Sequence, residues 1–143
     1  MNLTRVLPVA VILAIAAASG LNPLRAQTSR SGPSQGAYTA AQAAAGAKLY
    51  TATCSACHGA TLRGITAPAL IGDAFTSQFT GEPAEDAYVL MSGNMPLTAP
   101  GSLKPAEYLA LMAYILQQNK FPAGNTPLTE TKLKSIKIVS PRS

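Results

Sequence analysis

The chain has 143 residues, of which 48% are hydrophobic and 12% are charged, and it contains no tryptophan. This length suits one globular domain with a modest core and leaves no room for two. The net charge of +5 lies mainly outside residues 38–119, which carry three basic and five acidic side chains. Nucleic-acid binding needs a basic face on the folded domain, so this class is excluded.

Residues 1–26 have the pattern of a secretory signal peptide. Arg5 supplies the positive start, and an apolar stretch of thirteen residues, 6–18, is followed by small residues. We expect cleavage after Ala26, with Ala18 as the alternative. Thirteen apolar residues fall short of the roughly 20 that span a bilayer. The mature protein is therefore expected in the periplasm, without stable membrane insertion.

A flexible leader is expected at residues 27–37, which are rich in serine, glycine and glutamine. The stretch "TAAQAAAGAKLY" then begins at Thr39 and consists largely of residues with high helix propensity. Thr39 and Gln42 have the types and spacing of a capping box. The domain is therefore predicted to start with a helix that runs up to the first cysteine.

The stretch "CSACHG", residues 54–59, contains both cysteines and the single histidine of the chain. C-x-x-C-H is the attachment signature of c-type haem. Two thiols three residues apart on one turn can reach the vinyl groups on one side of a porphyrin, and the following imidazole then points at the iron. We predict one covalent haem c on Cys54 and Cys57, with His58 as an axial iron ligand.

Three other interpretations of this stretch are weaker. A Cys54–Cys57 disulfide would close a loop too small to constrain the unfolded chain and would not explain His58. A thioredoxin-like redox pair requires a preceding strand, whereas the preceding residues favour a helix. Structural zinc requires four ligands, and only three candidates are present.

A second helix is predicted from Pro83, where "PAEDAYVLM" has helical periodicity up to Met91. It is followed by "SGNMPLTAPG", which is too rich in glycine, asparagine and proline for regular structure and contains Met95. Haem iron takes a sixth ligand, and a thioether is the common choice in electron-transfer haem. Met95 is our candidate; Met91, a lysine, a tyrosine or an open site are the alternatives.

A third helix is predicted over residues 104–120, with Pro105 in the first turn and Glu107 placed favourably for the helix dipole. Apolar residues at positions 108, 111, 112 and 115 form one face of this helix, so Met112 is interpreted as a core residue. Residues 125–143 mix apolar and basic side chains and are expected to form a partly ordered surface extension, with a partner-docking tail as the alternative.

Residues 38–124 resemble a monohaem class I cytochrome c. Gly46, Tyr50 and Cys54, each four residues apart, match the family's first helix, and Tyr114 matches its aromatic residue at the helix crossing. The resemblance implies an all-α fold of three to five helices wrapped around one covalently attached haem. In that fold the N- and C-terminal helices cross, and the glycine permits their close approach.

The resemblance also implies roles for single residues. The carbonyl of Pro68 is expected to accept a hydrogen bond from the His58 imidazole, and Leu70 and Leu111 are expected to contact the haem. A loop methionine followed by proline matches the family's distal ligand, which is Met95 here.

The resemblance breaks at one position. Close relatives often have a tryptophan that donates a hydrogen bond to a haem propionate. Phe79 stands in that position and has no donor, so Arg63, Gln78 or a backbone amide would substitute.

The resulting functional hypothesis is a single-electron carrier with a low-spin His/Met haem, rather than an enzyme. The resemblance to small periplasmic cytochromes of quinoprotein dehydrogenases implies a periplasmic dehydrogenase as donor and a terminal oxidase as eventual acceptor. Residues 67, 68, 95–97 and 100 would form an uncharged rim for docking these redox partners. The alternatives are a haem enzyme or gas sensor with an open distal site, and a cytochrome subunit of a dehydrogenase complex.

Overall fold

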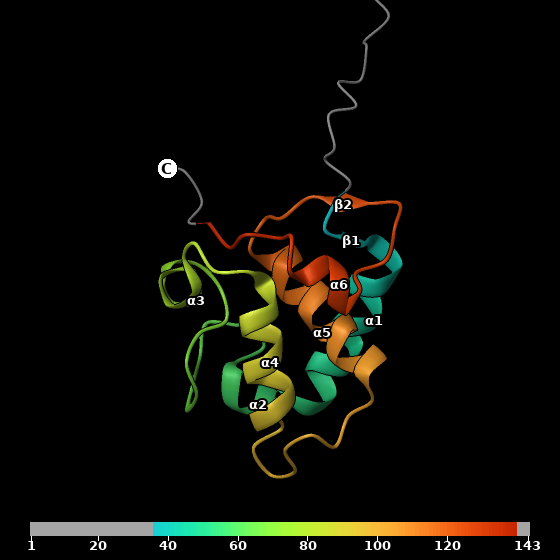
Figure 1. Ribbon diagram of the computed structural model, residues 1–143. Helices are drawn as coiled ribbons and strands as arrows, with labels where there is room; N and C mark the ends of the chain where they lie inside the picture. The colour runs from blue at the N-terminus through green and yellow to red at the C-terminus, as the bar shows by residue number, and fades with distance from the viewer. Residues whose placement is uncertain (1–35, 140–143) are drawn as a thin grey trace, which may run out of the picture. The chain divides into compact units, whose positions relative to one another are not determined.

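The computed structural model describes residues 36–139, so the predicted signal peptide and most of the leader lie outside the described residues. Nearly all regular structure in this range is helical, and the predicted all-α class is confirmed (Figure 1). None of the described helices is long and apolar enough to cross a membrane. Residues 36–139 form six helices: α1 (Ala40–Thr53), α2 (Ser55–His58), α3 (Asp73–Phe79), α4 (Ala84–Asn94), α5 (Pro105–Gln118) and α6 (Glu130–Leu133).

Two short strands join the start and the end of the domain, and the sequence did not predict them. Strand β1 (Tyr38–Thr39) pairs in parallel with β2 (Ala123–Gly124). The backbone N–H of Ala37 also donates to the carbonyl of Pro122 at 2.8 Å. The last residues of the expected leader, Gly36 and Ala37, are therefore buried.

Helix α1 begins at the predicted cap, but only half of the capping box forms. The Thr39 side chain accepts a hydrogen bond from the Gln42 N–H at 3.2 Å. The Gln42 side chain does not return to Thr39. Instead it bonds both backbone groups of Leu128, donating to the carbonyl at 3.0 Å and accepting from the N–H at 2.7 Å. A side chain predicted to cap a helix therefore links α1 to the C-terminal segment.

Helices α1 and α5 cross in close contact, as expected from the glycine in α1. A Cβ atom at Gly46 would overlap the backbone carbonyl of Ala110, so only glycine permits this approach. The rings of Tyr50 and Tyr114 pack beside the crossing, with centroids 5.4 Å apart. This contact fixes where the C-terminal end of α1 lies relative to α5.

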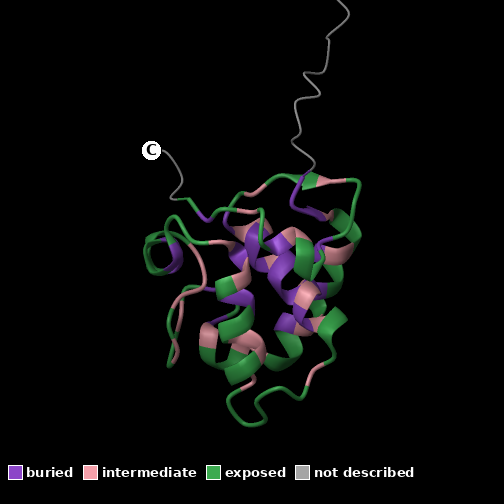
Figure 2. Ribbon diagram, in the orientation of Figure 1, coloured by how far each residue is buried: buried purple, intermediate pink, exposed green. Residues whose placement is uncertain are grey.

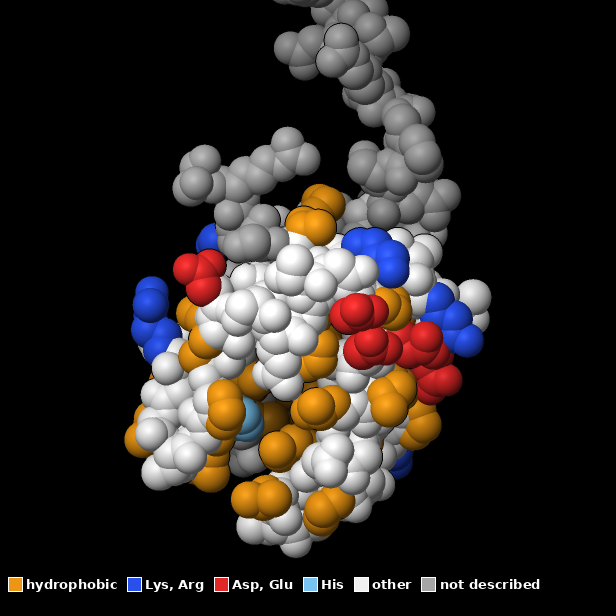
Figure 3. Space-filling view, turned by 60° about the vertical axis from the view of Figure 1, so that its left-hand side comes forward, with side chains coloured by type: hydrophobic (Ala, Val, Ile, Leu, Met, Phe, Trp, Pro, Cys, Tyr) orange, Lys and Arg blue, Asp and Glu red, His pale blue; other side chains and the backbone are white. Residues whose placement is uncertain are grey.

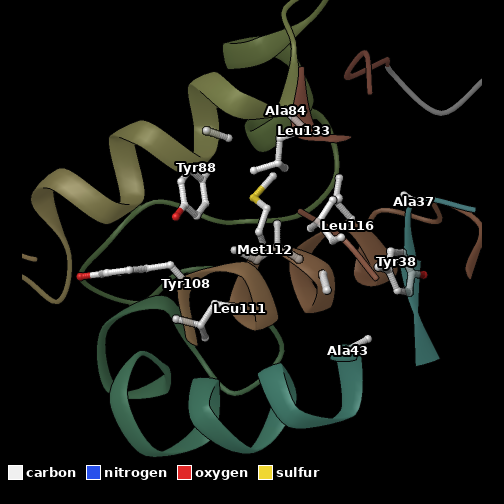
Figure 4. Packing of buried hydrophobic residues seen from close by; sticks show 14 of the residues in the cluster. Ala37, Tyr38, Ala43, Ala84, Tyr88, Tyr108, Leu111, Met112, Leu116 and Leu133 are labelled. Atoms are coloured by element: carbon white, nitrogen blue, oxygen red, sulfur yellow. The ribbon is translucent and has the colours of Figure 1, made fainter. Parts of the chain in front are cut away.

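Helix α5 is the centre of the core, and Figure 2 shows buried residues concentrated on it. Glu107 accepts a hydrogen bond from the Lys104 N–H at 2.7 Å and so caps the first turn. In Figure 4, Met112 points from α5 toward Leu133 and Ala84, which lie on other elements. The predicted apolar face is confirmed; its buried members include Tyr108, Leu111, Met112 and Ile115.

Residues 125–139, which we call the C-terminal strap, belong to the same core as the rest of the domain. Leu128, Leu133 and Ile138 are almost completely buried. The Tyr88 hydroxyl donates to the Glu130 carboxylate at 3.0 Å; burial first, and this carboxylate second, raise the pKa of Tyr88 to about 12. The strap is thus attached to α4 by both apolar and polar contacts.

The strap also completes the start of α4, where no side chain caps the helix. The N–H of Ala84 donates to the carbonyl of Ile136 at 2.8 Å. Next to it, Ile138 donates to Glu82 at 3.0 Å and accepts from Gly81 at 2.9 Å. The strap therefore gives the first N–H group of α4, which the helix itself leaves without a partner, a hydrogen-bond acceptor.

Replacing Leu133 with alanine tests whether the strap is part of the core. Leu133 is 0% exposed, so Leu133→Ala should lower the free energy of unfolding by about 2–5 kcal/mol in denaturant titrations of the holoprotein. Val139→Ala, at a side chain 58% exposed in the same segment, should change it by less than about 0.5 kcal/mol. Equal, small effects of both changes would contradict the packing described for the strap.

Candidate haem site

The attachment motif occupies one tight turn at the end of α1. Cys54 ends α1 and precedes α2, and its carbonyl accepts hydrogen bonds from the N–H groups of Cys57 at 3.2 Å and His58 at 3.0 Å. This turn brings the two thiols and the imidazole to one wall of a cavity. No disulfide joins the two cysteines; Cys54 is partly buried and Cys57 is exposed.

The His58 ring is held by the loop that follows it. Nδ1 lies 2.8 Å from the carbonyl oxygen of Pro68. Since a carbonyl only accepts, this contact puts the proton on Nδ1 and leaves the lone pair of Nε2 available for a metal. The ring is thus oriented by a contact of the type that commonly fixes metal-ligating histidines.

The loop after the motif is folded back onto it by a cluster of backbone hydrogen bonds. The carbonyl of Cys57 accepts from Ile65 at 3.0 Å and from Thr66 and Ala67 at 3.2 Å each. Gly64 turns the chain with a φ of 80°, and a Cβ there would lie 2.6 Å from the carbonyl oxygen of Ala67. These contacts explain how a proline ten residues away reaches the imidazole.

The buried end of the turn is fixed by Tyr50, whose hydroxyl donates to the carbonyl of Gly59 at 2.6 Å. Burial is the main reason that the pKa of Tyr50 is raised to about 12, so this hydroxyl keeps its proton at physiological pH. Burial also raises the pKa of the Cys54 thiol, and its hydrogen bond with Thr53 acts in the opposite direction.

Met95 lies at the end of α4, in the wall formed by this helix and its following loop. Its N–H donates to the carbonyl of Met91 at 2.9 Å, and its own carbonyl accepts from the Tyr108 hydroxyl at 2.5 Å. Met91 and Met112 also line the cavity, so the structure brings three thioethers to it.

The cavity has a volume of about 480 Å³, within the range of small-molecule and cofactor sites. Figure 3 shows the histidine side chain in a hollow among hydrophobic side chains. No aspartate, glutamate, lysine or arginine of the described residues lines it. Its further walls come from α3, α4, α5 and the loops; they include Leu70, Phe75, Gln78, Phe79, Ala87, Leu90, Leu97, Leu103, Leu111 and Ile115.

These residues fit a covalently attached haem. Two cysteine side chains stand beside an imidazole whose Nε2 can bind iron, and the surrounding walls are apolar, as a porphyrin face requires. Within residues 36–139, no group of three or more His, Cys, Asp or Glu side chains is arranged to hold a metal ion on its own. Cys54 and Cys57 would hold the macrocycle, and His58 would bind its iron.

The family comparison agrees with this site. Residues 41–115, just over half of the chain, match the family model described as cytochrome c oxidase, cbb3-type, subunit III. The chain belongs to this family. It is therefore a class I c-type cytochrome, with the all-α fold and the covalently bound haem c that this implies.

A solved structure supports the fold of this cytochrome. A chain in the crystal structure of the sulfane dehydrogenase SoxCD from Paracoccus pantotrophus matches with a TM-score of 0.57 and 21% sequence identity. The match covers 67% of this cytochrome and 52% of that chain, so this cytochrome spans about half of its length. No curated protein matches.

The structure brings together most residues that the sequence singled out. Pro68, Leu70, Leu111 and Met95 line the same cavity as the attachment motif. Of the three suggested propionate partners, Gln78 lines the cavity and Arg63 does not. The roles of these residues as haem contacts and ligands stay predictions.

Sequence reasoning missed one residue that shapes the wall beside Leu70. Asn119, buried just after α5, donates to the carbonyl of Leu70 at 2.9 Å and accepts from the N–H of Gly72 at 3.0 Å. It therefore ties the loop before α3 to the last turn of α5. An asparagine at the end of a predicted helix indicates only a cap, so the sequence carried no signal for this contact.

Replacing the two methionines of α4 and its loop separately tests which thioether binds iron. Met95→Ala should abolish the weak long-wavelength sulfur-to-iron absorption of the ferric protein, whereas Met91→Ala should keep it, because Met91 lies inside α4. The measurement is the optical spectrum of each purified holoprotein. The opposite pattern would assign the ligand to Met91.

Proposed function

We propose that this cytochrome is a single-electron carrier with one low-spin haem, whose axial ligands are His58 and Met95. One observation carries the proposal: an oriented imidazole and a loop thioether line the same apolar cavity. Bound haem supplies a one-electron redox centre, and a thioether ligand raises its potential. The residues of the chain hold the group, orient the imidazole through Pro68 and exclude water.

A haem enzyme or gas sensor is the less supported function. Enzymatic use of haem needs a vacant coordination position and usually a distal acid–base group. No carboxylate or second histidine of the described residues lines the cavity. Among its titratable groups besides the attachment motif, the Tyr50 and Tyr108 hydroxyls already donate to backbone carbonyls.

The proposed location is the periplasm, and the proposed partners are a periplasmic dehydrogenase as donor and an acceptor leading to a terminal oxidase. The signal-peptide pattern of residues 1–26 and the covalent haem attachment motif support export. The fold likeness to a chain of a sulfane dehydrogenase is compatible with service to a dehydrogenase, either as a free carrier or as a bound subunit. Isolation of a stable complex from the native organism would favour the subunit.

Carbon monoxide distinguishes the carrier from the enzyme or sensor. With Met95 on the iron, the reduced wild-type protein should bind carbon monoxide only slowly. The Met95→Ala variant should bind it much faster than the wild type, because a coordination position of the iron is then open. Stopped-flow spectroscopy at the haem bands measures both rates. Equally rapid binding by the wild type would contradict the carrier assignment.

Docking is proposed to use the apolar rim, defined as residues 67, 68, 95–97 and 100. These residues are uncharged, and Leu97 is 77% exposed. Salt screens the interaction between charges that lie far from the contact, so docking through this rim should depend only weakly on ionic strength. A small, weakly apolar contact is also typical of transient redox complexes.

Salt dependence tests this face. Between about 0.01 and 0.15 M ionic strength, the rate of reduction by a candidate quinoprotein dehydrogenase with its substrate should change by less than about threefold. Leu97→Glu should slow reduction, and Val139→Glu, outside the rim, should not. A steep fall of the wild-type rate with salt would show that charged residues elsewhere guide docking.

A further inference from the structure

The strongest unassigned feature is the hydrogen bond between Tyr108 and the backbone of Met95. Tyr108 lies in the first turns of α5 and is 3% exposed. Its hydroxyl donates to the carbonyl oxygen of Met95 at 2.5 Å. Figure 4 shows its ring extending away from α5 beside Leu111.

This bond holds Met95 at a point where the helix no longer does. Helix α4 ends at Asn94, and Met95 already has an extended backbone. Its N–H is bonded to Met91 of α4, and its carbonyl is bonded to Tyr108 of α5. Met95 is therefore fixed on both sides, between two different helices.

The rest of the loop offers no comparable anchor. The other backbone hydrogen bonds of residues 96–103 join loop residues to one another, and the bond from Gly101 to the Met95 carbonyl is long at 3.4 Å. Residues 97–102 are exposed. Among the hydrogen bonds of residues 36–139, the Tyr108 hydroxyl makes the one that connects Met95 or this loop to α5.

We propose that Tyr108 is a positioning residue that keeps the Met95 thioether on the haem iron. This inference rests on the proposed His58/Met95 ligation. Without the hydroxyl, the Met95 carbonyl loses its short bond, and the loop can carry the thioether away from the cavity more often. The iron then has an open position for a larger fraction of the time.

The test uses Tyr108→Phe in the full-length holoprotein, with Tyr38→Phe as the matched control. The Tyr38 hydroxyl also donates to a backbone carbonyl, that of Phe121 at 2.7 Å, and its side chain is equally buried. Tyr38 does not line the cavity. Both changes keep the aromatic ring and remove one hydroxyl, so their effects on global stability should be similar.

The readout is carbon monoxide binding to the reduced proteins, together with the sulfur-to-iron absorption of the ferric proteins. Tyr108→Phe should bind carbon monoxide about tenfold faster than the wild type, which corresponds to about 1.4 kcal/mol. Tyr38→Phe should match the wild type. In a Met95→Ala background, adding Tyr108→Phe should change nothing further, because the two residues act on one step.

Other outcomes overturn the inference in distinguishable ways. Equal rates for both tyrosine variants, or loss of holoprotein for Tyr108→Phe alone, would show that Tyr108 serves the fold and not the ligand. An additional rate increase in the Met95→Ala background would show that Tyr108 acts on the iron site by another route. A wild type that lacks the sulfur-to-iron absorption would overturn the proposed ligation itself, and the inference with it.

Discussion

The close contact of α1 with α5 at Gly46 is the constraint on which the rest of the site depends. It fixes the end of α1, and hence the turn with Cys54, Cys57 and His58, relative to α5. The same helix α5 contributes Leu111 to the cavity and, through Tyr108, holds the backbone of Met95. Both proposed iron ligands are therefore positioned against one buried helix, which is how two residues 37 positions apart in sequence come to share one cavity.

Helix α4 is held at both ends by groups of other elements, the C-terminal strap and α5. At the start of α4, its first N–H group donates to the carbonyl of Ile136 in the strap. Along the helix, the Tyr88 hydroxyl donates to Glu130 of the strap. Just after the last turn, the carbonyl of Met95 accepts from the Tyr108 hydroxyl of α5. A helix of this length has little stability of its own in water. Its place in the fold, and so the place of the loop that carries Met95, depends on these tertiary contacts.

The parts of the fold that the sequence predicted are those with local signals. The C-x-x-C-H turn, the capped start of α1 and the apolar face of α5 each follow from residues a few positions apart. The parts that were not predicted depend on distant partners. Helix α3 starts after Gly72 without a side-chain cap, and the buried residues Leu128, Leu133 and Ile138 of the strap follow neither a helical nor a strand period. Asn119 and Gln42 bond backbone groups 49 and 86 positions away, which no local pattern indicates.

The most direct test of the account is nuclear magnetic resonance of the reduced holoprotein with its methionine methyl groups labelled. A methyl group on an iron-bound sulfur lies directly over the porphyrin, so the ring current shifts its resonance far from the others. The chain has four methionines, and we expect one strongly shifted methyl resonance, which disappears in Met95→Ala and remains in Met91→Ala and Met112→Ala. The absence of any strongly shifted methyl resonance, or its loss in Met91→Ala instead, would contradict the account.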